Sequence, residues 1–234
     1  MNTINDFVRA QTIEIVTGLV PEIHLHLARD SHRIFEATRR LQQDCTEAAS
    51  YPPYWAFAWP GGQAMARHIL DTPTLARGQR IADIGSGSGI AAIAAARAGA
   101  TRVMAVDVDP LAVAAIALNS KRNGVDGTVE ISGEDCLADL LPVDLVLISD
   151  LVYEPELAVR VGAFVERCLA SGIPVIVGDR MSARCPARGF TEITRYEAPL
   201  TPALCDEDTE HGRIWYARAS RRETRRADRA KLPR

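Results

Sequence analysis

Residues 83–90 read Asp-Ile-Gly-Ser-Gly-Ser-Gly-Ile, and this stretch decides the fold class. It overlaps the end of a short apolar run at 80–84 and leads into an alanine-rich segment at 90–98. This order predicts a strand, a tight turn and a helix. Glycines in the turn allow sharp bends and let a ligand approach the backbone without a Cβ in the way. We therefore expect a flat or anionic ligand against the turn formed by Gly85, Gly87 and Gly89.

The glycine spacing argues against a dinucleotide-binding loop. The pattern Gly-x-Gly-x-x-Gly would require a third glycine where this sequence has Ile90, counting from Gly85, or Ala92, counting from Gly87. Asp107 ends the next predicted strand, where an acidic side chain meets the ribose hydroxyls of a ligand draped over the glycine turn. The same carboxylate would repel a ribose 2′-phosphate. The pattern favours a nucleoside-like ligand with free hydroxyls.

Asp107 could instead cap the helix that we expect to begin at Pro110, but Asp109 is better placed for that role.

Short strand-like runs and helix-like segments alternate along the rest of the chain. This alternation is typical of an α/β fold with a parallel, Rossmann-like sheet and helices on both faces. Two strand-like runs after residue 188 predict a C-terminal antiparallel hairpin at one sheet edge. The predicted strands are 80–84, 102–107, 128–132, 144–149, 174–178, 190–196 and 213–219, and the predicted helices are 63–70, 90–98, 110–123 and 156–170.

Composition points to a globular protein of ordinary size. The 234 residues are 47% hydrophobic and 24% charged, which is enough apolar material for a substantial core. No apolar run approaches the ~20 residues of a membrane span, and the N-terminus lacks the features of a signal peptide. Five scattered cysteines without a Cys-x-x-Cys pair predict neither a disulfide framework nor a zinc site, and we expect no metal. A reducing cytoplasm suits such a chain.

The glycine turn and the acidic residue after it resemble the first motifs of class I S-adenosylmethionine-dependent methyltransferases. That family carries Asp-x-Gly-x-Gly-x-Gly, as at Asp83 to Gly89, followed by an acid that ends the second strand. The resemblance implies a seven-stranded sheet and S-adenosylmethionine as cofactor, with Asp83 in the cofactor-binding set. It also implies that Asp135, after the third strand, contacts the adenine amino group. Asp135 could otherwise be an acid in a surface turn.

The end of the fourth predicted strand narrows the resemblance. Residues 150–153 read Asp-Leu-Val-Tyr, which looks like the Asp-x-x-Tyr/Phe motif of the seven-β-strand protein-lysine methyltransferases. Amide- and adenine-methylating relatives carry Asn/Asp-Pro-Pro-Tyr/Phe here, and this sequence does not. Residues 55–63 and 21–25 resemble the lysine methyltransferases of the electron transfer flavoprotein β subunit, which are related to ribosomal-protein methyltransferases. The implied partner is a protein substrate, with that β subunit first and a ribosomal protein second.

Physical chemistry suggests a role for each site residue that the resemblance implies. Asp150 would attract the lysine ammonium and orient the amine. We do not expect it to act as a general base, because a nearby carboxylate raises the pKa of lysine and so works against its deprotonation. Tyr153 would form part of the lysine channel. Trp59 would lie over the methionine end of the cofactor, where an indole face favours a cation, and Gly61 would permit close approach there. Asp150 could instead cap the helix near Glu156, and both aromatic rings could be plain packing.

The expected organisation has three parts. Residues 1–62 form an N-terminal extension with an aromatic pocket segment, residues 63–220 the methyltransferase domain, and residues 221–234 a basic tail. The tail carries seven of the 27 basic residues, which leaves 20 basic and 28 acidic residues in 1–220. We favour a solubilising role for the tail over contact with RNA or an acidic protein, and we expect a monomer. Methylation of a small molecule or nucleic acid, and a catalytically idle binding module, stay as alternatives.

Overall fold

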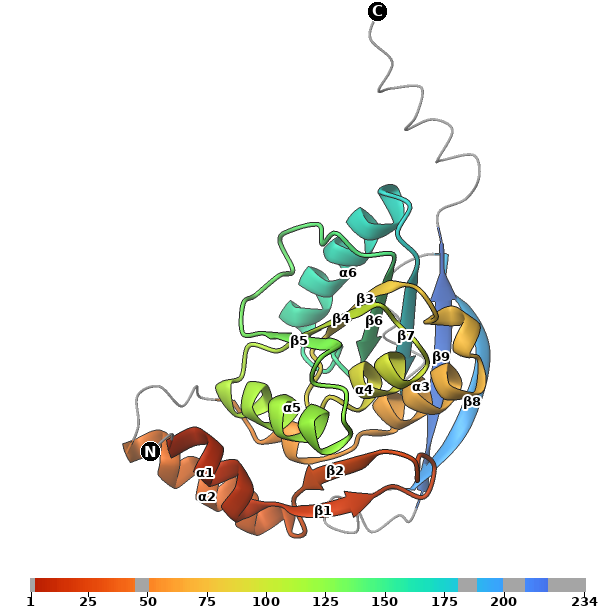
Figure 1. The fold of residues 1–234 in the computed structure, drawn as a ribbon. Helices are drawn as coiled ribbons and strands as arrows, with labels where there is room; N and C mark the ends of the chain where they lie inside the picture. The colour runs from red at the N-terminus through yellow and green to blue at the C-terminus, as the bar shows by residue number, and fades with distance from the viewer. Residues whose placement is uncertain (1–2, 45–50, 181–188, 200–208, 219–234) are drawn as a thin grey trace, which may run out of the picture.

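The computed structural model describes residues 3–44, 51–180, 189–199 and 209–218 (Figure 1). Seven strands form the main sheet, and their spatial order is β5-β4-β3-β6-β7-β9-β8. The first five are parallel, whereas β9 pairs antiparallel with both β7 and β8. The predicted hairpin at the sheet edge is confirmed. The strands are β3 (Arg80–Ile84), β4 (Arg102–Val106), β5 (Val129–Ser132), β6 (Leu145–Ser149), β7 (Val175–Asp179), β8 (Thr191–Pro199) and β9 (Thr209–Ala217).

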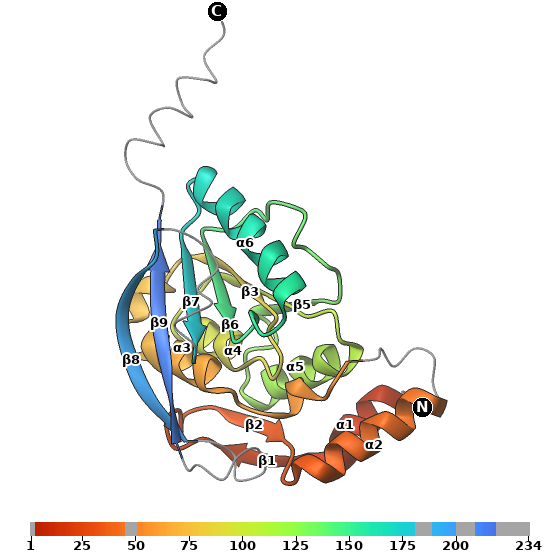
Figure 2. The same cartoon turned by 180° about the vertical axis from the view of Figure 1, so that it is seen from behind.

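Helices cover both faces of the sheet, as Figures 1 and 2 show. Successive side chains of a strand point to opposite faces, so the central strands are apolar throughout. Leu145 and Leu147 pack in the core under α3 (Pro60–Asp71) and α4 (Ile90–Arg97). Val146 and Ile148 pack on the other face under α6 (Pro155–Ala170). The prediction of a doubly covered α/β sheet is therefore confirmed.

The N-terminal segment packs against α5 (Pro110–Arg122). It comprises α1 (Thr3–Gln11), β1 (Ile13–Val16), β2 (His24–Leu27), α2 (Ser31–Asp44) and the short 3-10 helix Tyr54–Ala56; a second 3-10 helix, Pro73–Leu75, follows α3. Asn119 on α5 and Asn123 just after it accept hydrogen bonds from the His26 and His24 amides, at 2.7 and 3.0 Å. Trp55 and Leu111 share one buried cluster. The extension and the sheet domain thus share a core.

Some sequence features fall outside the described residues, namely the tail at 221–234 and Cys45, Cys185 and Cys205. Cys136 and Cys168 are free thiols.

Among the described helices, none has the length and apolar character needed to cross a membrane.

Candidate active site

An open cavity of about 820 Å³ lies at the carboxyl ends of β3, β4, β6 and β7. Parallel α/β sheets bind ligands at this edge, because the loops that follow neighbouring strands converge there. Three of the predicted site residues, Gly61, Asp83 and Gly89, do not line the cavity. The predicted residues that do line it are Trp59, Gly85, Gly87, Asp107, Asp135, Asp150 and Tyr153.

The glycine turn is fixed to the end of β4. Gly85, Gly87 and Gly89 all have positive φ, at 68°, 55° and 82°, a conformation that favours glycine. The amides of Gly85 and Ser86 donate to the Val106 carbonyl at 2.9 and 3.0 Å. The Gly87 amide donates to Asp107 Oδ2 at 2.8 Å. These bonds hold the turn directly beside the Asp107 carboxylate.

Asp83 supports the turn from behind. Its side chain is buried, and Oδ2 accepts hydrogen bonds from Ser86 Oγ at 2.6 Å and from the Ala92 amide at 3.1 Å. Burial raises the pKa of Asp83 to about 6. The contacts give Asp83 a part in shaping the loop, while its carboxyl stays away from the cavity.

Asp107 and Asp109 divide two roles between them. Asp109 caps α5, since Oδ1 accepts from the Leu111 amide at 2.9 Å. Asp107 Oδ1 accepts from the Asp109 amide at 3.0 Å while its other oxygen holds the glycine turn. Burial raises the pKa of Asp107, and that of Asp109 to about 7. Asp107 is therefore the acid of this pair that lies against the glycine turn.

Asp150 occupies a constrained position directly after β6. Within the described chain it is the sole non-glycine residue with positive φ, at 49°. Its amide donates to the Gly178 carbonyl at 2.9 Å, and its Oδ2 accepts from the Gly62 amide at 2.9 Å. The carboxyl thus sits at the N-terminus of α3, where the helix dipole favours an anion. Glu154, not Asp150, precedes α6 at the N-cap position.

The second oxygen of Asp150 has a different environment from the first. Oδ1 is buried and makes no hydrogen bond of normal geometry within the residues that the structure describes, although the nearby Gly61 amide helps to lower the pKa of Asp150. Burial, with a further contribution from the negative charge of Asp179, raises the pKa of Asp150 to about 7. A buried acceptor without a partner is unfavourable until a donor arrives. The Asp150 carboxyl therefore combines burial, a raised pKa and an oxygen without a hydrogen bond of normal geometry in the described chain.

Gly61 lets α3 approach this corner of the sheet. A Cβ at this position would lie 2.4 Å from the Gly178 carbonyl oxygen and 2.7 Å from Asp150 Oδ1. Close packing, rather than contact with the cavity, is the role that the structure gives Gly61.

Aromatic side chains form a continuous wall beside Asp150. Tyr153 and Tyr54 make an edge contact with ring centroids 5.3 Å apart, and Tyr54 and Trp59 make another at 5.8 Å. Trp59 Nε1 donates to the Tyr54 carbonyl at 2.9 Å, which fixes the indole. Burial raises the pKa of Tyr153 to about 12, so the phenol stays neutral at pH 7. Such a wall suits the aliphatic stem of a lysine and the face of a cation.

Asp135 lines the cavity from the segment after β5, the edge strand of the sheet. It forms an ion pair with Arg160, which holds its pKa below the usual range, and its Oδ1 accepts from the Leu137 amide at 3.1 Å.

Several acids that the sequence analysis did not select also line the cavity. Asp179 ends β7, one residue beyond the predicted strand at 174–178. Its position directly after an apolar run is the sequence signal that could have identified it as a site residue. The lining contains eight acidic residues, which are Asp107, Asp109, Glu134, Asp135, Asp150, Glu154, Glu156 and Asp179, against Arg160 and Arg180. This balance favours cationic ligands.

Within the described ranges, no group of three or more His, Cys, Asp or Glu side chains is arranged to hold a metal.

Comparison with known proteins identifies the family. The Caenorhabditis elegans electron transfer flavoprotein beta subunit lysine methyltransferase homolog is 31% identical over 206 residues, which cover 81% of each chain. The present chain belongs to the electron transfer flavoprotein β-subunit lysine methyltransferase family. The rat enzyme of this family is 41% identical over 166 residues, or 69% of this chain and 62% of the rat protein. In the vertebrate relatives the match spans 60–63% of their length.

Two further comparisons agree with this family at a coarser level. The family model described as ribosomal protein L11 methyltransferase matches residues 64–153, which include the glycine turn and Tyr153. A proposed RNA methyltransferase from Pyrococcus horikoshii has a TM-score of 0.54 at 16% identity, covering 79% of this chain and all of that one. At this identity the likeness concerns the fold alone.

Proposed function

We propose that this chain is an S-adenosylmethionine-dependent protein-lysine N-methyltransferase whose substrate is the electron transfer flavoprotein β subunit. Membership of the family supports the substrate, and the cavity supports the chemistry. The observation that carries the proposal is the buried Oδ1 of Asp150, which has no hydrogen bond of normal geometry to the described residues, in an acidic cavity beside Tyr153. A lysine ammonium is the donor that this arrangement would accept.

The cavity residues fit the proposed cofactor. Asp107 lies against the glycine turn, where it would accept hydrogen bonds from the ribose hydroxyls. Asp135 would contact the adenine end, and Trp59 the cationic methionine end. Asp83 and Gly89 would act through the shape of the turn, since neither reaches the cavity, and Gly61 would act through packing. The acidic lining suits a ligand that carries a sulfonium and an ammonium group.

Positioning is the main task of the protein in this reaction. S-adenosylmethionine, when bound, supplies a methyl group that is electrophilic without assistance. The surrounding residues have to hold one neutral amine in line with this methyl group. Correct orientation of the two reactants contributes strongly to lowering the barrier of such a reaction. Asp150 would receive the ammonium and fix the direction of its nitrogen, while the rings of Tyr54 and Tyr153 would enclose the lysine stem.

Deprotonation of the lysine sets the remaining barrier. A free lysine has a pKa near ~10.4, so presenting its neutral amine at pH 7 costs roughly 4.6 kcal/mol. A carboxylate beside the amine raises that pKa further, so Asp150 suits binding and orientation, with water receiving the proton. The incoming ammonium would in turn lower the pKa of Asp150 and keep its carboxyl ionised.

Transfer of a labelled methyl group tests the proposal. The full chain is incubated with methyl-labelled S-adenosylmethionine and purified electron transfer flavoprotein, and tandem mass spectrometry locates the label. We expect label on lysine side chains of the β subunit, and a large reduction of it with Asp150→Asn. Label confined to nucleic acid or small metabolites would contradict the proposal.

A ribosomal protein is the second candidate substrate. The match of residues 64–153 to the ribosomal protein L11 methyltransferase model favours it. The same assay with purified ribosomal protein L11 separates the two, because label should follow the true substrate. We further propose that the chain works as a monomer in the cytoplasm, where the free thiols of Cys136 and Cys168 would stay reduced.

A further inference from the structure

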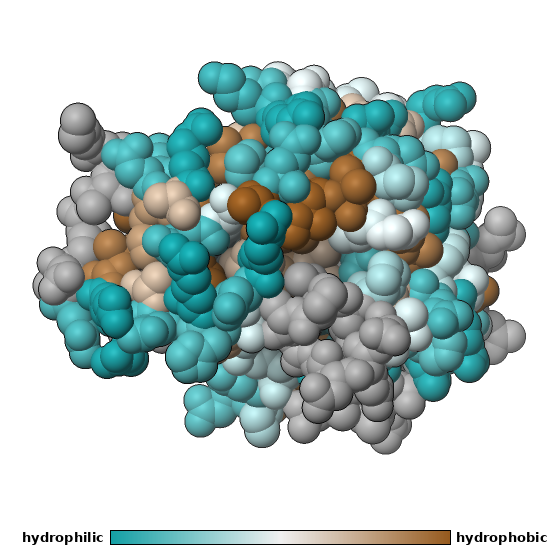
Figure 3. All heavy atoms as spheres, turned by 90° about the horizontal axis from the view of Figure 1, so that it is seen from below, coloured by the Kyte–Doolittle hydropathy of each residue, from teal (hydrophilic) through white to brown (hydrophobic). Residues whose placement is uncertain are grey.

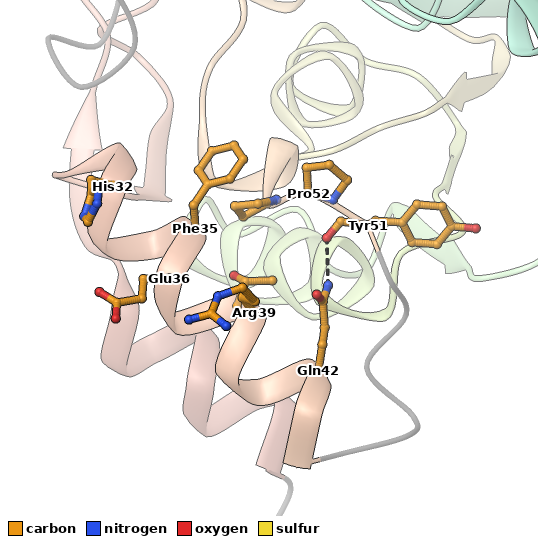
Figure 4. Close-up of a pocket in the computed structure, with 9 residues that line it drawn as sticks. His32, Phe35, Glu36, Arg39, Gln42, Tyr51 and Pro52 are labelled. Atoms are coloured by element: carbon orange, nitrogen blue, oxygen red, sulfur yellow. Dashed lines mark hydrogen bonds between the residues drawn. The ribbon is translucent and has the colours of Figure 1, made fainter.

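A second hollow adjoins the cavity on the side of α2. It has a volume of about 580 Å³ and lies between α2 and residues 51–53 (Figure 4). We call it the α2 groove. Its α2 wall consists of His32, Phe35, Glu36, Thr38, Arg39 and Gln42, and its other wall of Tyr51, Pro52 and Pro53. The helical spacing of these positions puts one face of α2 along the groove.

The α2 groove lies next to the cavity. Tyr51 and Pro52 line both hollows, so they form the ridge between them. The Gln42 side chain donates to the Tyr51 carbonyl at 2.9 Å and ties this ridge to α2. In Figure 4 the Tyr51 ring extends away from α2. A chain lying in the groove could therefore place a side chain over the ridge into the cavity.

The surface of the groove suits a polypeptide segment. Phe35 and Tyr51 are each 42% exposed, which is high for such large apolar rings. The hydroxyl of Thr38 is buried and has no hydrogen-bond partner among the residues described here. Apolar rings and an unused polar group together can bind a peptide through both its side chains and its backbone.

The groove presents one positive charge that belongs to no ion pair in the described ranges. Glu36 is paired with Arg40, its neighbour one turn along the helix. Arg39 is exposed, and no ion pair joins it to another residue in the described ranges. Among the described residues, Arg39 therefore gives the groove a positive charge without an ion-pair partner, while acids dominate the cavity.

We propose that the α2 groove holds the segment of the substrate protein that carries the target lysine, and that Arg39 pairs with an acidic side chain of that segment. This inference rests on the proposed function. Phe35 and Pro52 contact an apolar side chain of the same segment. A nucleic acid fits less well, because one arginine would face its phosphates while eight acids in the neighbouring cavity repel them. Figure 3 shows the molecule from below, the end at which α2 lies in Figure 1, with apolar surface between hydrophilic side chains.

Kinetics of charge-reversal variants test the groove. Arg39→Glu is compared with Arg33→Glu, a matched control because Arg33 is also exposed on α2 but does not line the groove. The substrate is purified electron transfer flavoprotein with S-adenosylmethionine. We expect Arg39→Glu to raise KM for the flavoprotein about 10-fold while kcat and cofactor affinity change less than about two-fold. Arg33→Glu should leave all three within about two-fold of the wild type.

The outcomes distinguish a failure of the groove proposal from a failure of the proposed function. Equal KM values for the two variants, with methyl transfer intact, would contradict the proposed role of the groove but would not affect the proposed function. Absence of methyl transfer by the wild type to any protein would overturn both.

A photo-crosslinker at position 35 gives a second readout that does not depend on charge. With p-benzoylphenylalanine in place of Phe35, we expect crosslinks to the flavoprotein segment that contains the methylated lysine. Crosslinks to a distant segment, or to a second copy of this chain, would contradict the proposal.

Discussion

Asp150 joins two elements that are distant in sequence. Its backbone adopts a left-handed conformation, which costs about 1–2 kcal/mol for a residue with a Cβ. The hydrogen bonds to Gly62 and Gly178 hold it there. Strain of this kind gathers at functional sites. It places a buried carboxyl at the N-terminus of α3.

The pH dependence of methyl transfer should reflect the ionisation of the Asp150 carboxyl. Its pKa is about 7, so the carboxyl is neutral below that pH and anionic above it. Because the anion attracts the lysine ammonium, kcat/KM should rise as pH increases through about 7. Asp150→Asn should lower kcat/KM about 10- to 100-fold at pH 8 and remove this step. A wild-type profile without the step would contradict the assignment.

Protein stability should respond to the same carboxyl. Its pKa is raised above the usual 3.8, so between pH 4 and 7 the folded chain retains a proton that the unfolded chain releases. The contribution of Asp150 to stability therefore falls as pH rises through that window. The Tm of Asp150→Asn minus that of the wild type should become more positive from pH 5 to pH 8. A difference that is independent of pH would contradict the burial of this charge.

The sequence predicted the candidate residues better than their arrangement. Asp107 and Asp150 each directly follow a strand, and such positions can be found by pattern alone. The bond from Gly62 to Asp150 joins segments 88 residues apart, so no local pattern reveals it. The same holds for Gly61, whose close neighbour is Gly178.

At the level of elements, the strands that carry the cavity were predicted to within one residue of their ends. Their apolar runs are continuous, and the turn at residues 85–89 marks a boundary. The helix α2 was not predicted. Its sequence is mostly polar and charged, with Ile34, Phe35, Ala37 and Leu41 as the apolar residues, and among its described side chains only Ile34 and Thr38 are buried.

The contact between α3 and β7 should be sensitive to a single methyl group. Gly61→Ala would place a Cβ 2.4 Å from the Gly178 carbonyl oxygen, so helix and strand must separate. We expect a loss of about 1–3 kcal/mol, or roughly 2–10 °C in Tm. Gly127→Ala is the control, because no atom lies within 4 Å of its Cβ position. Equal Tm values for the two variants would contradict the close approach.

At the scale of the whole molecule, charge is divided between regions. Residues 1–220 hold 28 acids against 20 basic residues, and eight of the acids line the cavity. A cavity lined by one sign of charge concentrates ligands of the other sign. The acidic cavity should therefore draw a lysine from solution.

Salt should weaken this attraction. Raising NaCl from about 0.05 to 0.3 M shortens the Debye length below about 10 Å, so kcat/KM for the flavoprotein should fall several-fold. A double variant, Glu154→Gln with Glu156→Gln, should respond less to salt because it removes two of the lining acids. A rate that is unchanged or rises with salt would show that the acids do not guide the substrate.

Calorimetric titration of S-adenosylmethionine into the purified chain tests the central claim most directly. The wild type should bind the cofactor at one site, and Asp107→Ala should bind it about 10- to 100-fold more weakly because the ribose hydroxyls lose a charged acceptor. Absence of binding by the wild type, or equal affinity in the two proteins, would contradict the account.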